Sequence, residues 1–125
     1  MDPSAPQPSR TEPIDKDIVA QLIIESRKSG TDFFPKYLHY FREDLAHAEQ
    51  DLDEVVSEKN AEPLLQIAHR LRGTASNFGA HPLVGLCLRV ETLIKDNRGS
   101  EALGVVPALL AELRRVQQAV RKLRN

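Results

Sequence analysis

Residues 34–56 read FPKYLHYFREDLAHAEQDLDEVV. Apolar residues recur here at intervals of four and three: Phe34, Leu38, Phe41, Leu45, Ala48, Leu52 and Val55. This spacing places one apolar stripe along an α-helix. The other positions carry many Asp and Glu residues, which is typical of a face in contact with water. The stretch therefore predicts a long helix that packs against other helices through a single stripe.

The same spacing continues through the rest of the chain. It predicts further helices with these stripes: Leu64, Ala68, Leu71, Ala75 and Phe78; Leu83, Leu86, Val90 and Leu93; Val106, Leu109, Leu113, Val116, Val120 and Leu123. A shorter helix is expected over residues 14–28, with Ile14, Ile18 and Leu22 on one stripe. Short connections make neighbouring helices antiparallel. We therefore expect an all-α fold, an up-down antiparallel four-helix bundle with a short additional N-terminal helix.

Local residue types indicate where these helices begin and end. Thr31 and Asn60 are expected to be N-caps. Gly79 is expected to end the helix that contains residues 64–78 in a left-handed conformation, and Pro82 suits the first turn of the next. Pro107 leaves the start of the last helix open between residues 100 and 106.

The 125 residues suit one domain. Residues 1–13 hold four of the eight prolines and are expected to be a disordered tail or linker, with the domain over residues 14–125. Cys87 is the single cysteine, which excludes a disulfide framework and a multi-cysteine zinc site and fits a reducing cytoplasm. No apolar run approaches the length of a membrane span.

The net charge of −1 hides an asymmetry between the two parts of the chain. Residues 1–68 carry 7 Lys/Arg and 14 Asp/Glu, whereas residues 69–125 carry 10 Lys/Arg and 4 Asp/Glu. A basic surface of this size would suit an acidic protein partner. It is too mild to indicate nucleic-acid binding.

His69 lies one position around its helix from the apolar stripe, so its imidazole is expected to face solvent. Four residues share its face at about 100° per residue: Leu65, Arg72, Gly73 and Ser76. A neutral imidazole nitrogen is a good phosphoryl acceptor. Arg72 would stabilise the negative charge that phosphoryl transfer spreads over the equatorial oxygens, and Ser76 would donate a further hydrogen bond.

Gly73 stands inside this helix, where glycine costs about 1 kcal/mol relative to alanine. The stripe continues on both sides of Gly73, so we expect the helix to continue and the glycine to clear space for a partner's reactive group. Leu65 has no evident core position and is expected to belong to a docking surface, bordered by Ile18 and Leu22. The alternative for Ile18 and Leu22 is that they only pack the first helix down.

The remaining histidines offer weaker sites. His39 and His47 lie off their helix's stripe, and His81 precedes Pro82 at a helix start. Asp44 and His47 have the i, i+3 spacing of metal ligands. A di-metal site in a bundle needs Glu-x-x-His twice and two more carboxylates, and the sequence has no second copy. We therefore expect no metal on this chain.

Residues 68–80 read AHRLRGTASNFGA. This segment resembles the phosphorylation motif of histidine-containing phosphotransfer (HPt) domains of two-component phosphorelays. That motif reads Ala-His-x-Leu-Lys-Gly, then small residues, a hydrophobe and Gly-Ala. The resemblance extends over about residues 14–125 and continues in the next helix at these positions: Leu83, Leu86, Cys87, Val90 and Glu91.

The resemblance implies that His69 is the phosphoacceptor, that Arg72 stands for the family's usual lysine, and that Gly73 is its clearance glycine. Some members place a polar side chain from the next helix against the acceptor ring, and Arg89 is the nearest candidate here. The implied partners are receiver domains of a hybrid sensor kinase or a response regulator, which supply the aspartyl phosphate and Mg²⁺. We expect a cytoplasmic, monomeric phosphoryl carrier with no cofactor, no kinase activity of its own, and no nucleic-acid or membrane partner.

Two other functions fit an all-helical chain with an exposed histidine. A histidine-kinase dimerisation domain normally has an acidic residue after the histidine and a proline soon after, whereas this chain has Arg70 and Thr74 there. A bundle that only binds a partner helix would leave Gly73 and Arg72 unexplained. Incorporation of phosphate at His69 separates the carrier from the purely structural alternative.

Overall fold

The computed structural model describes residues 11–123. Five helices follow one another between Lys16 and Arg121, and no strand occurs among the described residues. They are α2 (Lys16–Lys28), α3 (Phe34–Glu58), α4 (Leu64–Asn77), α5 (His81–Lys95) and α6 (Gly99–Arg121). The expectation of an all-helical fold is confirmed. Residues 1–10, most of the predicted tail, lie outside the described range.

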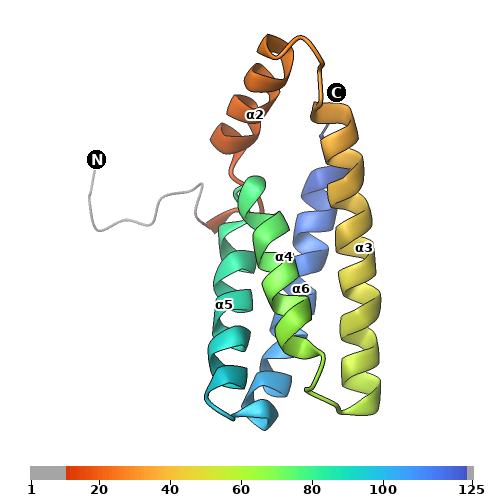
Figure 1. Cartoon of the computed structure of the whole chain (residues 1–125), viewed down its shortest axis with the longest axis vertical. Helices are drawn as coiled ribbons and strands as arrows, with labels where there is room; N and C mark the ends of the chain where they lie inside the picture. Colours follow the sequence, from red (N-terminus) through yellow and green to blue (C-terminus); the bar gives the residue numbers. More distant parts are fainter. Residues whose placement is uncertain (1–10, 124–125) are drawn as a thin grey trace, which may run out of the picture.

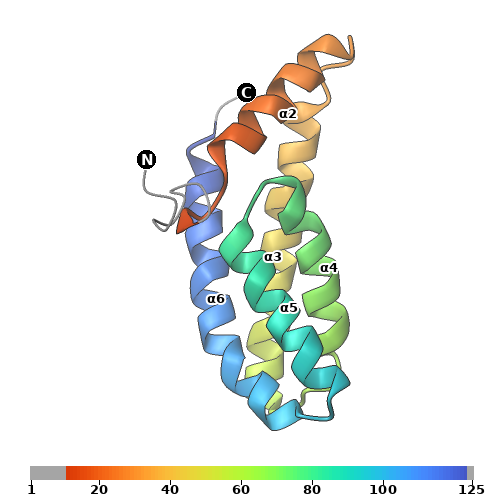
Figure 2. The same cartoon turned by 90° about the vertical axis from the view of Figure 1, so that its left-hand side faces the viewer.

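Helices α3, α4, α5 and α6 lie side by side in both views (Figures 1 and 2). Each packs against the next one in the chain, and α6 also packs against α3, so the four helices surround one core. Helix α2 lies at the end of the molecule where α3 begins, and contacts α3 (Figure 1). None of the helices between residues 11 and 123 combines the length and apolar character that a membrane span needs.

The predicted stripes of α3 and α4 form much of the core. All seven stripe residues of α3, from Phe34 to Val55, are buried. The five predicted around α4, from Leu64 to Phe78, are buried as well. Phe78 stacks on Phe41 with ring centroids 4.1 Å apart. This aromatic contact joins the end of α4 to α3 and fixes the face that α4 presents to solvent.

Helix α5 departs in part from the predicted stripe. Leu86 and Leu93 are only half-buried. The buried face consists of these residues: Leu83, Cys87, Val90 and Glu91. The difference arises because α5 packs against both α4 and α6 and therefore buries parts of two faces. One consequence is that an acidic residue, Glu91, stands inside the packed surface.

The first two helices are joined through a buried serine. Thr31 is not the N-cap of α3, because the helix begins at Phe34. The hydroxyl of Ser26 accepts a hydrogen bond from the Phe34 N–H at 2.8 Å and donates to Asp32 at 3.0 Å. Ser26 and Val19 are the buried residues of α2, whereas Ile18 and Leu22 are half-buried. The buried stripe of α2 is therefore shifted by one position from the prediction.

The other helix starts are confirmed in part. Pro82 stands in the first turn of α5, as expected. Asn60 accepts a hydrogen bond in the turn before α4, but the helix itself begins later, at Leu64. Helix α6 begins at Gly99, one residue before the expected range of 100–106, and contains Pro107. It continues through the proline because buried apolar residues stand on both sides of it.

A close contact fastens the start of α2 to the start of α5 and to the loop before it. Asp15 is the N-cap of α2, where one of its carboxylate oxygens accepts backbone hydrogen bonds. Its other carboxylate oxygen, Oδ2, lies 3.1 Å from Nε2 of His81. The hydrogen bond from His81 holds the pKa of Asp15 below its usual value. Gly79 has a φ of 63°, as its predicted left-handed conformation requires. A Cβ there would lie only 2.5 Å from Cβ of Asp15.

Candidate functional site

Helix α4 presents His69 to solvent. Ala68 is fully buried, whereas 70% of the side chain of the next residue, His69, is exposed. The rotation of about 100° per residue accounts for this change. The packing of the α4 stripe therefore determines the direction of the imidazole.

The His69 ring lies against a carboxylate from α5. Its Nδ1 is 3.0 Å from Oε1 of Glu91, whose side chain is only 4% exposed. Arg72, one turn after His69, donates from Nε to Oε2 of Glu91 at 2.6 Å, and its Nη2 lies 3.4 Å from Oε1. Two residues of α4 thus converge on one buried carboxylate of α5.

The charge on Glu91 determines where the histidine proton resides. The hydrogen bond from Arg72 lowers the pKa of Glu91, and the one from His69 acts in the same direction against the effect of burial. An ionised carboxylate only accepts hydrogen bonds, so a neutral His69 carries its proton on Nδ1. Nη2 of Arg72 also lies 3.2 Å from Nδ1, but a protonated Nδ1 has no lone pair to offer. Nε2 therefore keeps its lone pair.

Gly73 leaves open space one turn beyond His69. A Cβ at this position would meet nothing within 4 Å, and α4 continues through it to Asn77, as expected. The hydroxyl of Ser76 donates to the carbonyl oxygen of Arg72 at 2.8 Å. The Ser76 hydroxyl, which was expected to donate a hydrogen bond at the site, thus donates to the helix backbone instead.

The structure places the expected docking residues at two different parts of the molecule. Leu65 is half-buried and lines a pocket between α4 and α5 together with His69 and Glu91. Ile18 packs near Gly79, beyond the end of α4, which is about 15 Å from His69 along the helix axis. Leu22, on the same helix as Ile18, packs against the core. The structure brings Leu65 to His69, while Ile18 and Leu22 hold α2 at the end of the molecule.

Arg89 is not the side chain that meets the ring. It is exposed, and among the described residues no hydrogen bond or ion pair joins it to His69. Glu91, two positions later, points to the other side of α5 and occupies that role. The sequence offered one signal for this: Glu91 stands four residues after Cys87, at a helical spacing that puts an acid on a buried face.

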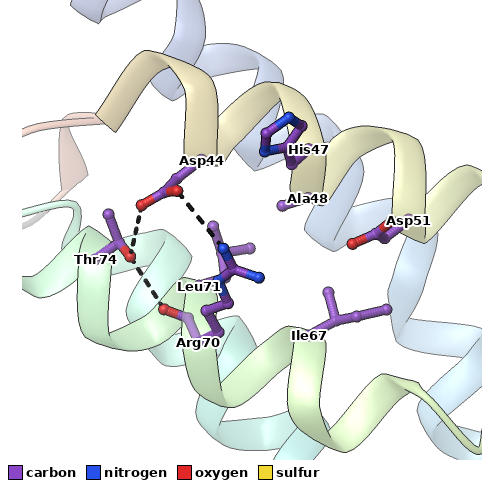
Figure 3. A pocket seen from close by; sticks show the side chains of 8 residues that line it. All are labelled: Asp44, His47, Ala48, Asp51, Ile67, Arg70, Leu71 and Thr74. Atoms are coloured by element: carbon purple, nitrogen blue, oxygen red, sulfur yellow. Dashed lines mark hydrogen bonds and ion pairs between the residues drawn. The ribbon is translucent and has the colours of Figure 1, made fainter. Parts of the chain in front are cut away.

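Other candidate chemistry in the chain is limited. Burial raises the pKa of the Cys87 thiol to about 12, so this residue is a buried thiol and not a nucleophile at neutral pH. Asp44, His47 and Asp51 of α3 line a small pocket between α3 and α4 (Figure 3). Over residues 11–123, no three His, Cys, Asp or Glu side chains are arranged to hold a metal ion.

Comparison with known families agrees with this geometry. A family model described as Hpt domain matches residues 36–119, which include α4, α5 and the His69 site. No match was found among curated proteins or among solved structures.

Proposed function

Because the chain belongs to the Hpt domain family, whose members transfer phosphoryl groups through histidine in two-component signalling, we propose that it relays a phosphoryl group between receiver domains through a phosphohistidine at His69. The observation that carries this proposal is the 3.0 Å contact between Nδ1 of His69 and Glu91. It leaves Nε2 as the nucleophile on an imidazole that is 70% exposed.

The proposed step uses only this ring and the partner's aspartyl phosphate. Nε2 attacks the phosphorus, an N–P bond forms, the bond from phosphorus to the aspartyl oxygen breaks, and the aspartate leaves as a carboxylate. The ring keeps its proton on Nδ1 and becomes positively charged. Glu91 stabilises that charge. Transfer to a second receiver reverses the step.

Arg72 and Gly73 have supporting roles in this proposal. The guanidinium of Arg72 lies beside Nδ1 of the ring and is bound to Glu91, so it would contact the equatorial oxygens of a phosphoryl group on Nε2 only after leaving Glu91. The open space at Gly73 would admit the partner's aspartyl phosphate. Ser76 would contribute a hydrogen bond only after releasing the Arg72 carbonyl.

We interpret α3 to α6 as an up-down antiparallel four-helix bundle with α2 as the additional helix. The support is the contact of each helix with the next, the closing contact between α3 and α6, and the short connections. In this arrangement α4 and α5 run in opposite directions. Glu91, near the end of α5, is then level with His69, near the start of α4.

The partners in this proposal are receiver domains, and the aspartyl phosphate and Mg²⁺ are expected on them. This chain supplies the nucleophile and the residues around it, as a cytoplasmic monomer without a cofactor. The alternative, a purely structural module, explains less of the site. It gives no reason for an exposed imidazole held by the buried carboxylate of Glu91, since burying a carboxylate costs desolvation free energy that an apolar side chain would avoid.

The proposal is tested with a receiver domain that has been phosphorylated on its aspartate by acetyl phosphate and Mg²⁺. The wild type gains one acid-labile, alkali-stable phosphate, and His69→Gln gains none. His39→Gln is the matched control, because His39 is also exposed and also pairs with a glutamate, Glu43, at 3.1 Å. Labelling of His69→Gln at the wild-type level would contradict the proposal.

A further inference from the structure

We propose that Arg72 is a positioning residue that acts on His69 through Glu91, and that it serves the reaction by fixing the tautomer of the ring and not by contacting the phosphoryl group. This inference rests on the proposed function and adds the role of one residue to it. The sequence alone favours a direct contact between Arg72 and the phosphoryl oxygens. The position of the guanidinium favours the indirect role.

The guanidinium of Arg72 lies on the Nδ1 side of the His69 ring. Its Nη2 is 3.2 Å from Nδ1, and its Nε and Nη2 are 2.6 Å and 3.4 Å from the two carboxylate oxygens of Glu91. Over residues 11–123, no hydrogen bond joins it to Nε2. The lone pair of Nε2 points away from Nδ1, because the two nitrogens stand on either side of one carbon. The guanidinium is therefore held on the side of the ring that the phosphoryl group does not approach.

Arg72 cannot leave Glu91 without a cost in free energy. The side chain of Glu91 is only 4% exposed, so water does not replace a partner that departs. A buried carboxylate that loses one partner is destabilised by its own desolvation. The partner that would remain, His69, is neutral before transfer. Arg72 therefore stays on Glu91 while Nε2 attacks the phosphorus.

The contact with Arg72 keeps Glu91 ionised. The hydrogen bond from Arg72 is the largest influence on the pKa of this carboxyl and lowers it, whereas burial raises it. An ionised Glu91 only accepts hydrogen bonds and keeps the ring proton on Nδ1. Without Arg72, burial favours the neutral acid, and a neutral acid can donate to Nδ1. The ring would then carry its proton on Nε2 and lose the nucleophilic lone pair.

Arg72 would have the opposite effect on the tautomer if Glu91 were absent. A guanidinium only donates hydrogen bonds, and its Nη2 lies within hydrogen-bond distance of Nδ1. Acting on the ring directly, it would favour a lone pair on Nδ1 and a proton on Nε2. Acting through Glu91, it favours the reverse. The effect of Arg72 on reactivity thus depends on Glu91, a dependence that direct contact with the phosphoryl oxygens would not create.

A double-mutant cycle over Arg72 and Glu91 tests this dependence. The donor is phosphoramidate, which needs no docking surface: Nε2 attacks its phosphorus, and the P–N bond breaks with release of ammonia. Arg72→Met keeps the aliphatic stem and is expected to slow the labelling of His69 about tenfold, a loss typical of residues that orient a histidine from behind. The same change made in Glu91→Ala should leave the rate within about twofold or raise it. An equal loss in both backgrounds would overturn the proposal.

The tautomer of the ring is the second readout, because a merely structural role would not move it. Long-range ¹H–¹⁵N spectra should show the proton on Nδ1 in the wild type and not in Arg72→Met. Arg72→Lys should recover it in part, since lysine restores the charge without the fork. Arg70→Ala is the matched control: Arg70 is also on α4, is 75% exposed and lies 4.0 Å from Asp44 instead of Glu91. It should change neither the tautomer nor the rate.

The remaining outcomes separate this inference from the proposed function. If Arg72→Met reacts slowly but keeps the wild-type tautomer, or reacts as fast as the wild type, Arg72 does not act through Glu91 and the proposed function stands. If a phosphorylated receiver fails to label His69 in the wild type, the proposed function fails, and the role of Arg72 in the relay fails with it.

Discussion

The carboxylate of Glu91, on α5, lies 3.0 Å from Nδ1 of His69, on α4. Since the carboxylate is ionised, this contact selects the tautomer that leaves Nε2 free. Replacing Glu91 removes the acceptor, so we expect Glu91→Ala to give a mixture of both neutral tautomers and slower transfer. Long-range ¹H–¹⁵N correlation spectra of the His69 ring measure the tautomers directly. A wild-type ring with its proton on Nε2 would refute this role.

The two glycines Gly73 and Gly79 should respond oppositely to alanine. Gly73→Ala meets no neighbour and should stabilise the fold by up to about 1 kcal/mol. Gly79→Ala should destabilise it by about 1–2 kcal/mol or more, because the residue is left-handed and an added Cβ meets Asp15. Urea unfolding of both variants gives the free energies. Gly73→Gln, with its longer side chain, should remain helical but transfer phosphate much more slowly; normal transfer would refute the clearance role.

Much of the fold follows from the sequence because apolar spacing is a local property. The stripe from Phe34 to Val55 is fully buried, as predicted. The prediction of Thr31 as the N-cap of α3 is wrong. The helix begins at Phe34, whose N–H donates to the hydroxyl of Ser26 from the preceding helix. Such a contact depends on how two helices meet, and spacing within one helix does not reveal it.

The candidate site shows the same limit. The exposure of His69, the proximity of Arg72 and the space at Gly73 all follow from positions on one helix. The partner from α5 depends on the rotation of that helix against α4. For this reason the sequence points to Arg89, whereas the structure places Glu91 beside the ring.

The Arg72–Glu91 pair should make stability depend on pH. The pKa of Glu91 is lowered from 4.5 in the folded state, so its contribution is complete above about pH 4.5 and is lost as the pH falls through the lower, folded value. Glu91→Gln lacks this titration but keeps Asp15 and Glu49, whose pKa values are also lowered. The unfolding free energy of the wild type minus that of Glu91→Gln should therefore decrease as the pH falls below 4.5. A difference that stays constant with pH would contradict the pairing.

Leu65 should matter for binding more than for folding. It is half-buried and lies beside His69, whereas its neighbour Leu64 is fully buried. Leu65→Asp is expected to weaken receiver binding and leave the melting temperature nearly unchanged, while Leu64→Asp should unfold the protein. Calorimetric binding and thermal melting measure the two effects. A large loss of stability in Leu65→Asp would place this residue in the core.

The most direct test of the phosphoryl-carrier account follows one phosphoryl group through the wild-type protein. The protein is first incubated with Mg-ATP alone, then with a phosphorylated receiver, and after purification with a second, unphosphorylated receiver and Mg²⁺. The account predicts no label from ATP, one label on His69 from the first receiver, and loss of that label to the second receiver. Labelling by ATP alone, or a phosphohistidine that no receiver removes, would contradict it.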